Sequence, residues 1–256
     1  MKIAMLGPFS AHVDGVRFAP TAHKPRQLLA LLAVHAGQVV PVDTVVEQLW
    51  GADATPKAHM TVQTYVLQLR NHLACAVGTA ARARELLVTR PSGYALLAGD
   101  EAVDAHAHDR LCAAAQLALE EGDDARAAAL FREALALWRG PALAGLSAGS
   151  VLGIEAMRLE QSRTAARERC LAAELRLGAH ERLLPELHEL TARDPHNEEL
   201  HGLLMTALDR SGQRARALAV YAGVRTRLDE TYGLLPSPRL RRLEQEVWGR
   251  IPAHQG

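Results

Sequence analysis

A helix predicted over residues 58–73 carries side chains that could read the bases of double-stranded DNA. Its apolar residues recur every three or four positions, so they share one face and should point into a core. They are Val62, Tyr65, Val66, Leu69 and Leu73. The other face contains no acidic residue, and its amides, hydroxyls and guanidinium can hydrogen-bond base edges and phosphates. Its members are Thr61, Gln63, Thr64, Gln68, Arg70 and Asn71.

Basic and hydroxyl side chains flank this helix in the sequence. Lys57 directly precedes it, and Arg90 and Ser92 lie in a later hairpin turn. Lys24 and Arg26 open an earlier helix, whose N-terminus can also face phosphates. Because neutralised phosphates supply most non-specific affinity for DNA, we expect these five residues to contact the DNA backbone or the minor groove.

Three helices are predicted, with short strands before and after them. These elements position the helix over residues 58–73. Residues 2–6 read as a strand, and Asp14-Gly15 is the signature of a tight hairpin turn. A Pro-Ser-Gly turn divides a second hairpin over residues 86–97. The three helices are predicted over about 23–35, from Pro41 to Trp50 and over 58–73. Strands, three helices and a final hairpin are the order of a winged helix.

From Asp104 onward the strand signals vanish and alanine-rich amphipathic segments follow. The segments are about 104–121, 123–138, 151–177, 180–193, 197–211, 213–232 and 237–248. A repeat is visible, because the stretch from Gly122 to Phe131 aligns with the stretch from Gly212 to Tyr221. Gly178 lies 34 residues before Gly212, which is the tetratricopeptide period. The fold expected is therefore an α+β winged-helix domain followed by an all-α tetratricopeptide-like domain.

The charge is unevenly distributed along a chain whose formal net charge is zero. Residues 1–98 contain 9 Lys and Arg against 5 Asp and Glu, and residues 99–256 contain 20 against 24. A basic front half suggests that any polyanion is met there. Hydrophobic residues make up 48% and charged residues 23%, which is normal for a globular protein and excludes a disordered one.

The cysteines and the apolar runs indicate the compartment. Cys75, Cys112 and Cys170 are odd in number and far apart, so we expect small buried hydrophobes in a reducing compartment rather than disulfides. The first residues form too short an apolar run for a signal peptide, and no stretch reaches the roughly 18 apolar residues of a membrane span. We expect a cytoplasmic, nucleoid-associated protein with no membrane partner.

An enzyme is the first alternative class, and the residues give it little support. His106 and His108 form the closest histidine pair, but a His-x-His at a helix start points its side chains apart. Glu120-Glu121 and Asp123-Asp124 are typical of a solvated helix end and an N-cap. No Gly-rich phosphate loop, Gly-x-Ser-x-Gly or His-Glu-x-x-His is present. No catalytic residue, metal site or cofactor is expected.

Several motifs together resemble the SARP (Streptomyces antibiotic regulatory protein) family. They are Leu49-Trp50-Gly51, Thr55-Pro56, the run from Thr61 to Arg70, and the hairpin ending in Gly93-Tyr94. The resemblance covers essentially the whole chain and corresponds to the small form of the family. It implies an OmpR-type winged helix at 1–98 and a tetratricopeptide-like bacterial transcriptional activator domain at 104–250.

The resemblance also implies a function. Members of the family bind short direct repeats upstream of the promoters of antibiotic biosynthetic genes, typically as two protomers side by side, and activate transcription by contacting RNA polymerase holoenzyme. Thr61, Thr64, Gln68 and Arg70 match the positions that enter the major groove, and Arg90 matches the wing. Where the family commonly has a further basic residue after Arg70, this chain has Asn71-His72.

A second alternative class is a helical-repeat scaffold or regulator. The concave surface of such repeats is built for partner segments. In that interpretation the helical domain senses a ligand or peptide, and the protein uses its winged helix to bind DNA as a repressor.

Overall fold

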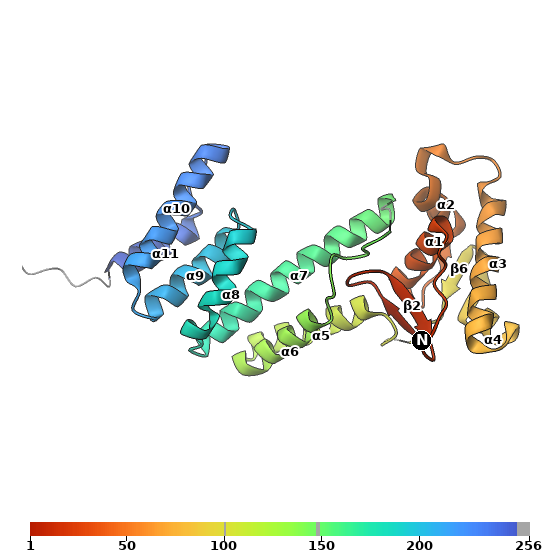
Figure 1. Ribbon diagram of the computed structural model, residues 1–256, viewed down its shortest axis with the longest axis horizontal. Coiled ribbons are helices and arrows are strands. Elements are labelled where there is room, and N and C mark those ends of the chain that lie inside the picture. Colours follow the sequence, from red (N-terminus) through yellow and green to blue (C-terminus); the bar gives the residue numbers. More distant parts are fainter. Residues whose placement is uncertain (100, 147–148, 250–256) are drawn as a thin grey trace, which may run out of the picture. The chain divides into compact units, whose positions relative to one another are not determined.

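A computed structural model describes residues 1–99, 101–146 and 149–249 (Figure 1). The chain forms two compact units. The first unit comprises Met1–Ala113 and Glu133–Ala165, and the second comprises Ala114–Arg132 and Ala166–Gly256. Helices α5 (Asp104–Glu120) and α7 (Ser150–Arg176) therefore contribute residues to both units. This division differs from the two domains expected from the sequence, because the first unit takes in residues on both sides of the expected boundary.

The first unit begins with a small antiparallel sheet in the order β1-β2-β3. The strands are β1 (Lys2–Ala4), β2 (Ser10–Val13) and β3 (Val16–Arg17). Asp14 and Gly15 join the last two with φ angles of 49° and 82°. Positive φ at both central residues is the hallmark of the type I′ hairpin, so the turn expected from Asp-Gly is confirmed.

The winged-helix elements follow in the expected order, and the fold prediction is confirmed. They are α1 (His23–Val34), β4 (Val40–Pro41), α2 (Val42–Trp50), η1 (Gly51–Asp53), α3 (Ala58–Val77), α4 (Ala80–Leu86), β5 (Leu87–Arg90) and β6 (Gly93–Leu96). A second sheet has the order β4-β6-β5. The sequence did not predict β4 or α4, and α3 continues beyond residue 73 to Gly78, whose left-handed backbone ends the helix.

Gly93 is required where β6 crosses β4. A Cβ at this position would overlap the carbonyl group of Val40, so no other residue allows the two strands to pair. The neighbouring Tyr94 is buried in the core.

The N-terminal segment is bonded on both sides by residues far along the chain. Ile3 N donates to Ala102 O at 2.6 Å, and Leu143 N donates to Met5 O at 2.8 Å. Pro8 and Ala144 form a parallel bridge on the same side. The first sheet is therefore extended by backbone from the loops before α5 and before α7, and these loops belong to the first unit.

The side chain of Asp104 links the N-terminal segment to the start of α5 and to Arg139. Its carboxylate accepts hydrogen bonds from Met5 N at 2.7 Å and Leu6 N at 3.3 Å. Arg139 Nη2 donates to the same carboxylate at 2.6 Å. The first residue of α5 thus satisfies two backbone donors of the segment after β1 and pairs with a cation from the loop after α6 (Asp124–Ala136).

A second link joins the start of α7 to α2. Gln48 is buried, and its Oε1 accepts a hydrogen bond from Leu152 N at 2.9 Å, in the first turn of α7. A Cβ at Gly149 would overlap Gln48, so this close approach also depends on glycine. One apolar core accordingly joins α1, α2 and α3 to Leu152 and Leu159 of α7.

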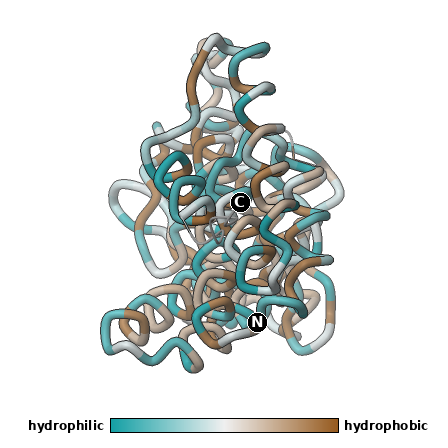
Figure 2. Tube along the Cα trace, turned by 90° about the vertical axis from the view of Figure 1, so that its left-hand side faces the viewer, coloured by the Kyte–Doolittle hydropathy of each residue, from teal (hydrophilic) through white to brown (hydrophobic). Residues whose placement is uncertain are grey.

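The second unit is entirely helical in the part of the chain that the structure describes. Besides parts of α5, α6 and α7 it contains α8 (His180–Arg193), α9 (Glu198–Arg210), α10 (Arg214–Tyr232) and α11 (Pro238–Gly249). The predicted segments match these helices to within about two residues. Figure 2 shows hydrophobic and hydrophilic residues alternating along the helices, as amphipathic packing requires.

The repeat seen in the sequence corresponds to a repeated turn. Gly122, Gly178 and Gly212 have φ angles of 78°, 87° and 76° and end α5, α7 and α9. The residue after each glycine donates its N–H to a carbonyl five residues back, at 2.8, 3.0 and 2.8 Å. This is the Schellman pattern of helix ends. The equivalent aromatic residues, Phe131 and Tyr221, are both buried, so the alignment is structurally meaningful.

Within the described residues, no helix combines the length and the apolarity that crossing a bilayer requires.

His201 is a buried titratable group in the second unit. Its Nε2 lies 3.0 Å from Arg227 Nη2, and its Nδ1 lies 2.9 Å from Asn197 O. Since the guanidinium can only donate, Nε2 accepts and Nδ1 carries the proton. Burial lowers the pKa of His201, and the charge of Arg227 lowers it further.

We expect Asp104→Ala to lower the free energy of unfolding by about 1–3 kcal/mol, because it leaves two partly buried backbone donors without an acceptor. Urea titration of the full chain measures the change. Asp109→Ala is the matched control on the same helix, since Asp109 only pairs with the surface residue Arg158 at 3.0 Å. That variant should lose about 0–1 kcal/mol. Equal losses from both variants would contradict the role assigned to Asp104.

We expect the stability of the chain to fall from pH 7 to pH 5 partly through His201. Its folded-state pKa is lowered, so the unfolded state binds more protons in this window and stability is lost as the pH falls. His201→Gln keeps a donor and an acceptor without titrating, and should flatten the pH dependence in urea titrations. His72→Gln, which changes an exposed histidine, should leave it unaltered. Identical profiles for the wild type and His201→Gln would refute the assignment.

Candidate nucleic-acid interface

Helix α3 presents the two faces that its sequence predicts. Val62, Val66, Leu69 and Leu73 are buried, and Tyr65 is half-buried against the same core. On the other side, the exposed members of the predicted reading face are Gln63, Thr64, Gln68 and Asn71. Figure 1 shows α3 at the edge of the first unit, with α1 and β6 on its inner side. The helix is held from one side and open on the other.

An aromatic stack positions the start of α3. Trp50, the last residue of α2, stacks on Tyr65 with ring centroids 6.1 Å apart and planes at 10°. Lys24 Nζ lies 4.3 Å from the centroid of the Trp50 ring, a cation–π contact. The stack orients α3 against α2, and the Lys24 ammonium lies over the last residue of α2.

Arg70 connects α3 to the wing. Its Nε and Nη2 donate to Leu87 O at 3.0 and 2.9 Å, and Nη2 also donates to Thr89 Oγ1 at 2.8 Å. Burial lowers the pKa of Arg70, while the nearby Tyr94 raises it and the like charge of Arg84 lowers it. The guanidinium is therefore engaged with β5. In contrast to the base reading expected from the sequence, its observed contacts position the wing.

Arg26 has an internal role as well. Its Nη2 donates to Phe9 O at 2.7 Å, and its guanidinium carbon lies 5.8 Å from the centroid of the Phe9 ring. The side chain is half-buried. These contacts tie α1 to the segment before β2, where the sequence led us to expect a contact with DNA phosphate.

Two threonine hydroxyls of α3 bond within the helix. Thr61 Oγ1 donates to Lys57 O at 3.1 Å, and Thr64 Oγ1 donates to Met60 O at 3.3 Å. Each hydroxyl has one proton and two lone pairs, so both oxygens remain able to accept. In this arrangement they suit donors such as the amino groups of cytosine and adenine.

Three further side chains belong to this surface, and the sequence analysis missed them. Met60 and Leu67 are exposed on α3, at 62% and 57% of their full surface. Apolar side chains are expected in a core, yet a helical projection places these two among Gln63, Thr64 and Gln68. Arg84 is exposed on α4, a helix that the sequence pattern does not predict. It adds a cation close to Arg70. Arg90 and Ser92 of the wing turn are exposed as well.

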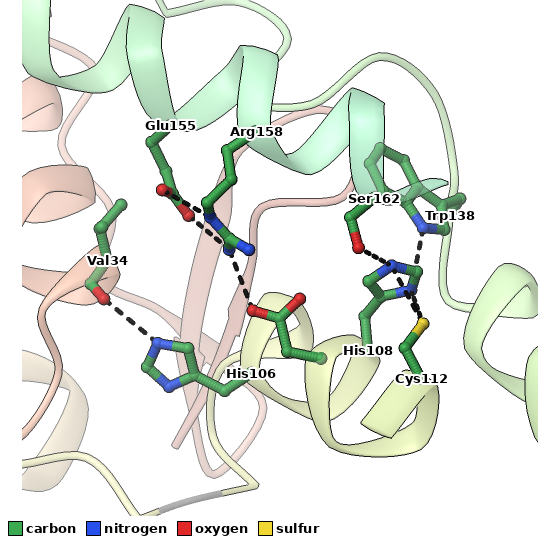
Figure 3. Close-up of polar contacts among 9 residues, drawn as sticks. Val34, His106, His108, Cys112, Trp138, Glu155, Arg158 and Ser162 are labelled. Atoms are coloured by element: carbon green, nitrogen blue, oxygen red, sulfur yellow. Dashed lines mark hydrogen bonds and ion pairs between the residues drawn. The ribbon is translucent and has the colours of Figure 1, made fainter. Parts of the chain in front are cut away.

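The histidine pair at the start of α5 has a packing role (Figure 3). His106 Nε2 lies 3.1 Å from Val34 O, whereas His108 points the other way. His108 Nδ1 lies 3.3 Å from Trp138 Nε1 and 3.2 Å from Ala134 O, and its Nε2 lies 3.2 Å from Ser162 Oγ. The predicted divergence of the two side chains is confirmed. Because His108 is fully buried, the contacts of its ring serve packing.

The acidic residues and cysteines are the other side chains with potential for catalysis or metal binding. Asp123 Oδ1 accepts from Arg126 N at 2.9 Å, which confirms its expected role as an N-cap. Cys75, Cys112 and Cys170 form no disulfide with one another; Cys170 is buried as expected, but Cys75 is exposed on α3. Among the described residues, no group of three or more His, Cys, Asp or Glu side chains could hold a metal ion.

Comparison with known proteins identifies both halves of the chain. Residues 103–248 match the family model of the bacterial transcriptional activator domain, and residues 19–96 match that of the C-terminal domain of transcriptional regulatory proteins. The regulatory protein DnrI of Streptomyces peucetius is 42% identical over 96% of this chain and 92% of its own length. The chain belongs to the SARP family. Its members here are transcriptional regulators, and the chain is not an enzyme.

Two other relatives extend the comparison. The transcriptional regulator RedD of Streptomyces coelicolor is 32% identical over 98% of this chain and 71% of its own length. A solved structure of Mycobacterium tuberculosis EmbR, in complex with a low-affinity phosphopeptide, is similar with a TM-score of 0.90 and 29% identity. The match covers 98% of this chain and 65% of EmbR. The winged helix and the helical domain therefore recur together in these proteins.

We expect Arg70→Met to lower the free energy of unfolding by about 1 kcal/mol, because it removes donors from the Leu87 carbonyl and the Thr89 hydroxyl. Arg90→Met, at an exposed position of the wing, should change stability by less than about 0.5 kcal/mol. Urea titration of the full chain measures both. A loss no larger for Arg70→Met than for Arg90→Met would contradict the anchoring role.

Proposed function

We propose that this protein binds promoter DNA in a sequence-specific manner through α3 and activates the genes of an antibiotic biosynthetic cluster. The observation that carries the proposal is the exposed face of α3. It contains amides and hydroxyls and no acidic side chain, and it lies on the third helix of a winged helix. Membership in the SARP family supports the same conclusion from sequence similarity.

The geometry suits a major groove. Helix α3 contains 20 residues. At about 1.5 Å per residue it is about 30 Å long, and an α-helix fits the groove's width of about 12 Å. We propose that Thr61, Gln63, Thr64, Gln68 and Asn71 face the bases. Lys57, at the N-terminus of the helix, and Arg90 and Ser92, in the wing turn, then contact phosphates or the minor groove. Lys24, in the first turn of α1, contacts phosphate as well.

The remaining steps of the proposal rest on the family. Two protomers bind adjacent direct repeats side by side, which is a head-to-tail arrangement rather than a two-fold dimer. The helical region then contacts RNA polymerase holoenzyme. Such a regulator works on the nucleoid in the cytoplasm. In vitro transcription from a promoter that the protein binds tests activation: output should rise with added protein, and a fall would favour the repressor alternative.

Binding experiments separate the reading residues from the phosphate contacts. We expect Arg90→Ala to weaken binding to all duplexes alike and to reduce the slope of log affinity against log salt by about one. Gln68→Ala should keep the slope and lose discrimination at one base pair, by about 1–3 kcal/mol. Gel shifts with the full chain and DNA selected from a random pool measure both effects.

Arg241→Ala is the matched control for these variants, because Arg241 is an exposed arginine of the second unit. It should leave both the affinity and the salt slope unchanged. If Arg90→Ala and Gln68→Ala also bind every duplex as the wild type does, α3 and the wing are not the interface.

A further inference from the structure

Two large apolar side chains interrupt the polar face of α3. Met60 and Leu67 keep 62% and 57% of their surface exposed. Leu67 is surrounded at helical spacing by Gln63, Thr64 and Asn71, all of them exposed. Neither apolar residue belongs to the core that Val62, Leu69 and their neighbours form on the other side of the helix. An apolar contact is therefore available on the face that otherwise offers hydrogen bonds.

The pattern indicates isolated apolar contacts rather than a protein-binding patch. Surfaces that bind other proteins are usually contiguous and apolar. Here Met60 and Leu67 are seven residues apart, and the exposed side chains of Gln63 and Thr64 lie between them. At about 1.5 Å per residue the two are separated by about 10.5 Å along α3, two turns of the helix. Each would thus meet a separate small apolar group.

The major groove offers one apolar group, the C5-methyl of thymine. We infer that Leu67 contacts the methyl group of one thymine and Met60 that of a second, about two to three base pairs away. The inference rests on the proposed function and deepens it, because it makes Met60 and Leu67 determinants of operator sequence. The acid-free face and the exposed Arg90 of the neighbouring wing place this contact within a polyanion-binding surface.

Uracil substitution tests the contact, because deoxyuridine lacks only the methyl group and keeps the hydrogen-bonding edge of thymine. The full chain is first used to select a duplex from a random-sequence pool. Each thymine of that duplex is then replaced singly by deoxyuridine, and affinity is measured by gel shift. For the wild type we expect about fourfold weaker binding at one position for each of the two side chains, from the loss of one buried methyl group.

Variants assign each position to a side chain. Leu67→Ala should bind the thymine and uracil forms equally at one position and keep the loss at the other, and Met60→Ala should do the reverse. Leu117→Ala is the matched control, since Leu117 is a similarly exposed leucine, at 59%, on α5. It should behave as the wild type. Circular dichroism melts confirm that each variant is folded, which the exposure of the substituted residues favours.

The outcomes distinguish this inference from the proposed function. If the selected duplex binds but no uracil substitution weakens it, or if Leu67→Ala retains every loss, the thymine contacts are refuted while DNA binding stands. If selection yields no duplex that binds above random DNA, the proposed function fails, and the inference fails with it.

Discussion

The carboxylate of Asp104 is the interaction on which the first unit depends. It satisfies the backbone N–H groups of Met5 and Leu6 and pairs with Arg139, so three distant stretches of chain meet at one side chain. A partly buried carboxylate is stabilised when it is both hydrogen-bonded and paired with a cation, and Asp104 has both partners. The sheet β1-β2-β3, the start of α5 and the loop before α7 are consequently parts of a single assembly.

That assembly determines how α3 is presented. Helix α3 is held through the Trp50–Tyr65 stack and through the contact of Arg70 with the wing. Gln48 of α2 is itself bonded to the first turn of α7. A helix restrained in this way would lose little conformational freedom on binding a partner, so little of its contact energy would be offset by ordering of the helix.

Much of the fold could be predicted from the sequence, because local signals agree with it. Apolar periodicity located the helices, and Asp14-Gly15 and the glycines that end helices located the turns. The short strand β4 escaped because two residues carry no periodicity, and its pairing depends on Gly93 meeting Val40 across a long separation in the chain. The contacts of Asp104 and Gln48 were likewise invisible, since nothing local marks a partner a hundred residues away.

The site was predictable to a similar degree. The helical projection separated the core face of α3 from its polar face, but it could not show which polar groups are already engaged. Arg70 and Arg26 resemble free cations in the sequence, yet each donates to a backbone carbonyl. Met60 and Leu67 are the opposite case. Apolar residues are normally expected in a core, yet both are exposed.

The place of Asp104 also bears on how such regulators can recombine. The sequence suggests the boundary between residues 98 and 104 as the position at which to exchange DNA-binding domains between relatives. An exchange there would separate the Asp104 carboxylate from the N–H groups of Met5 and Leu6. The contact would survive only if the incoming domain offered the same two donors in the same position. Natural or engineered hybrids should therefore inherit both stretches of the first unit, residues 1–113 and 133–165, from the same parent.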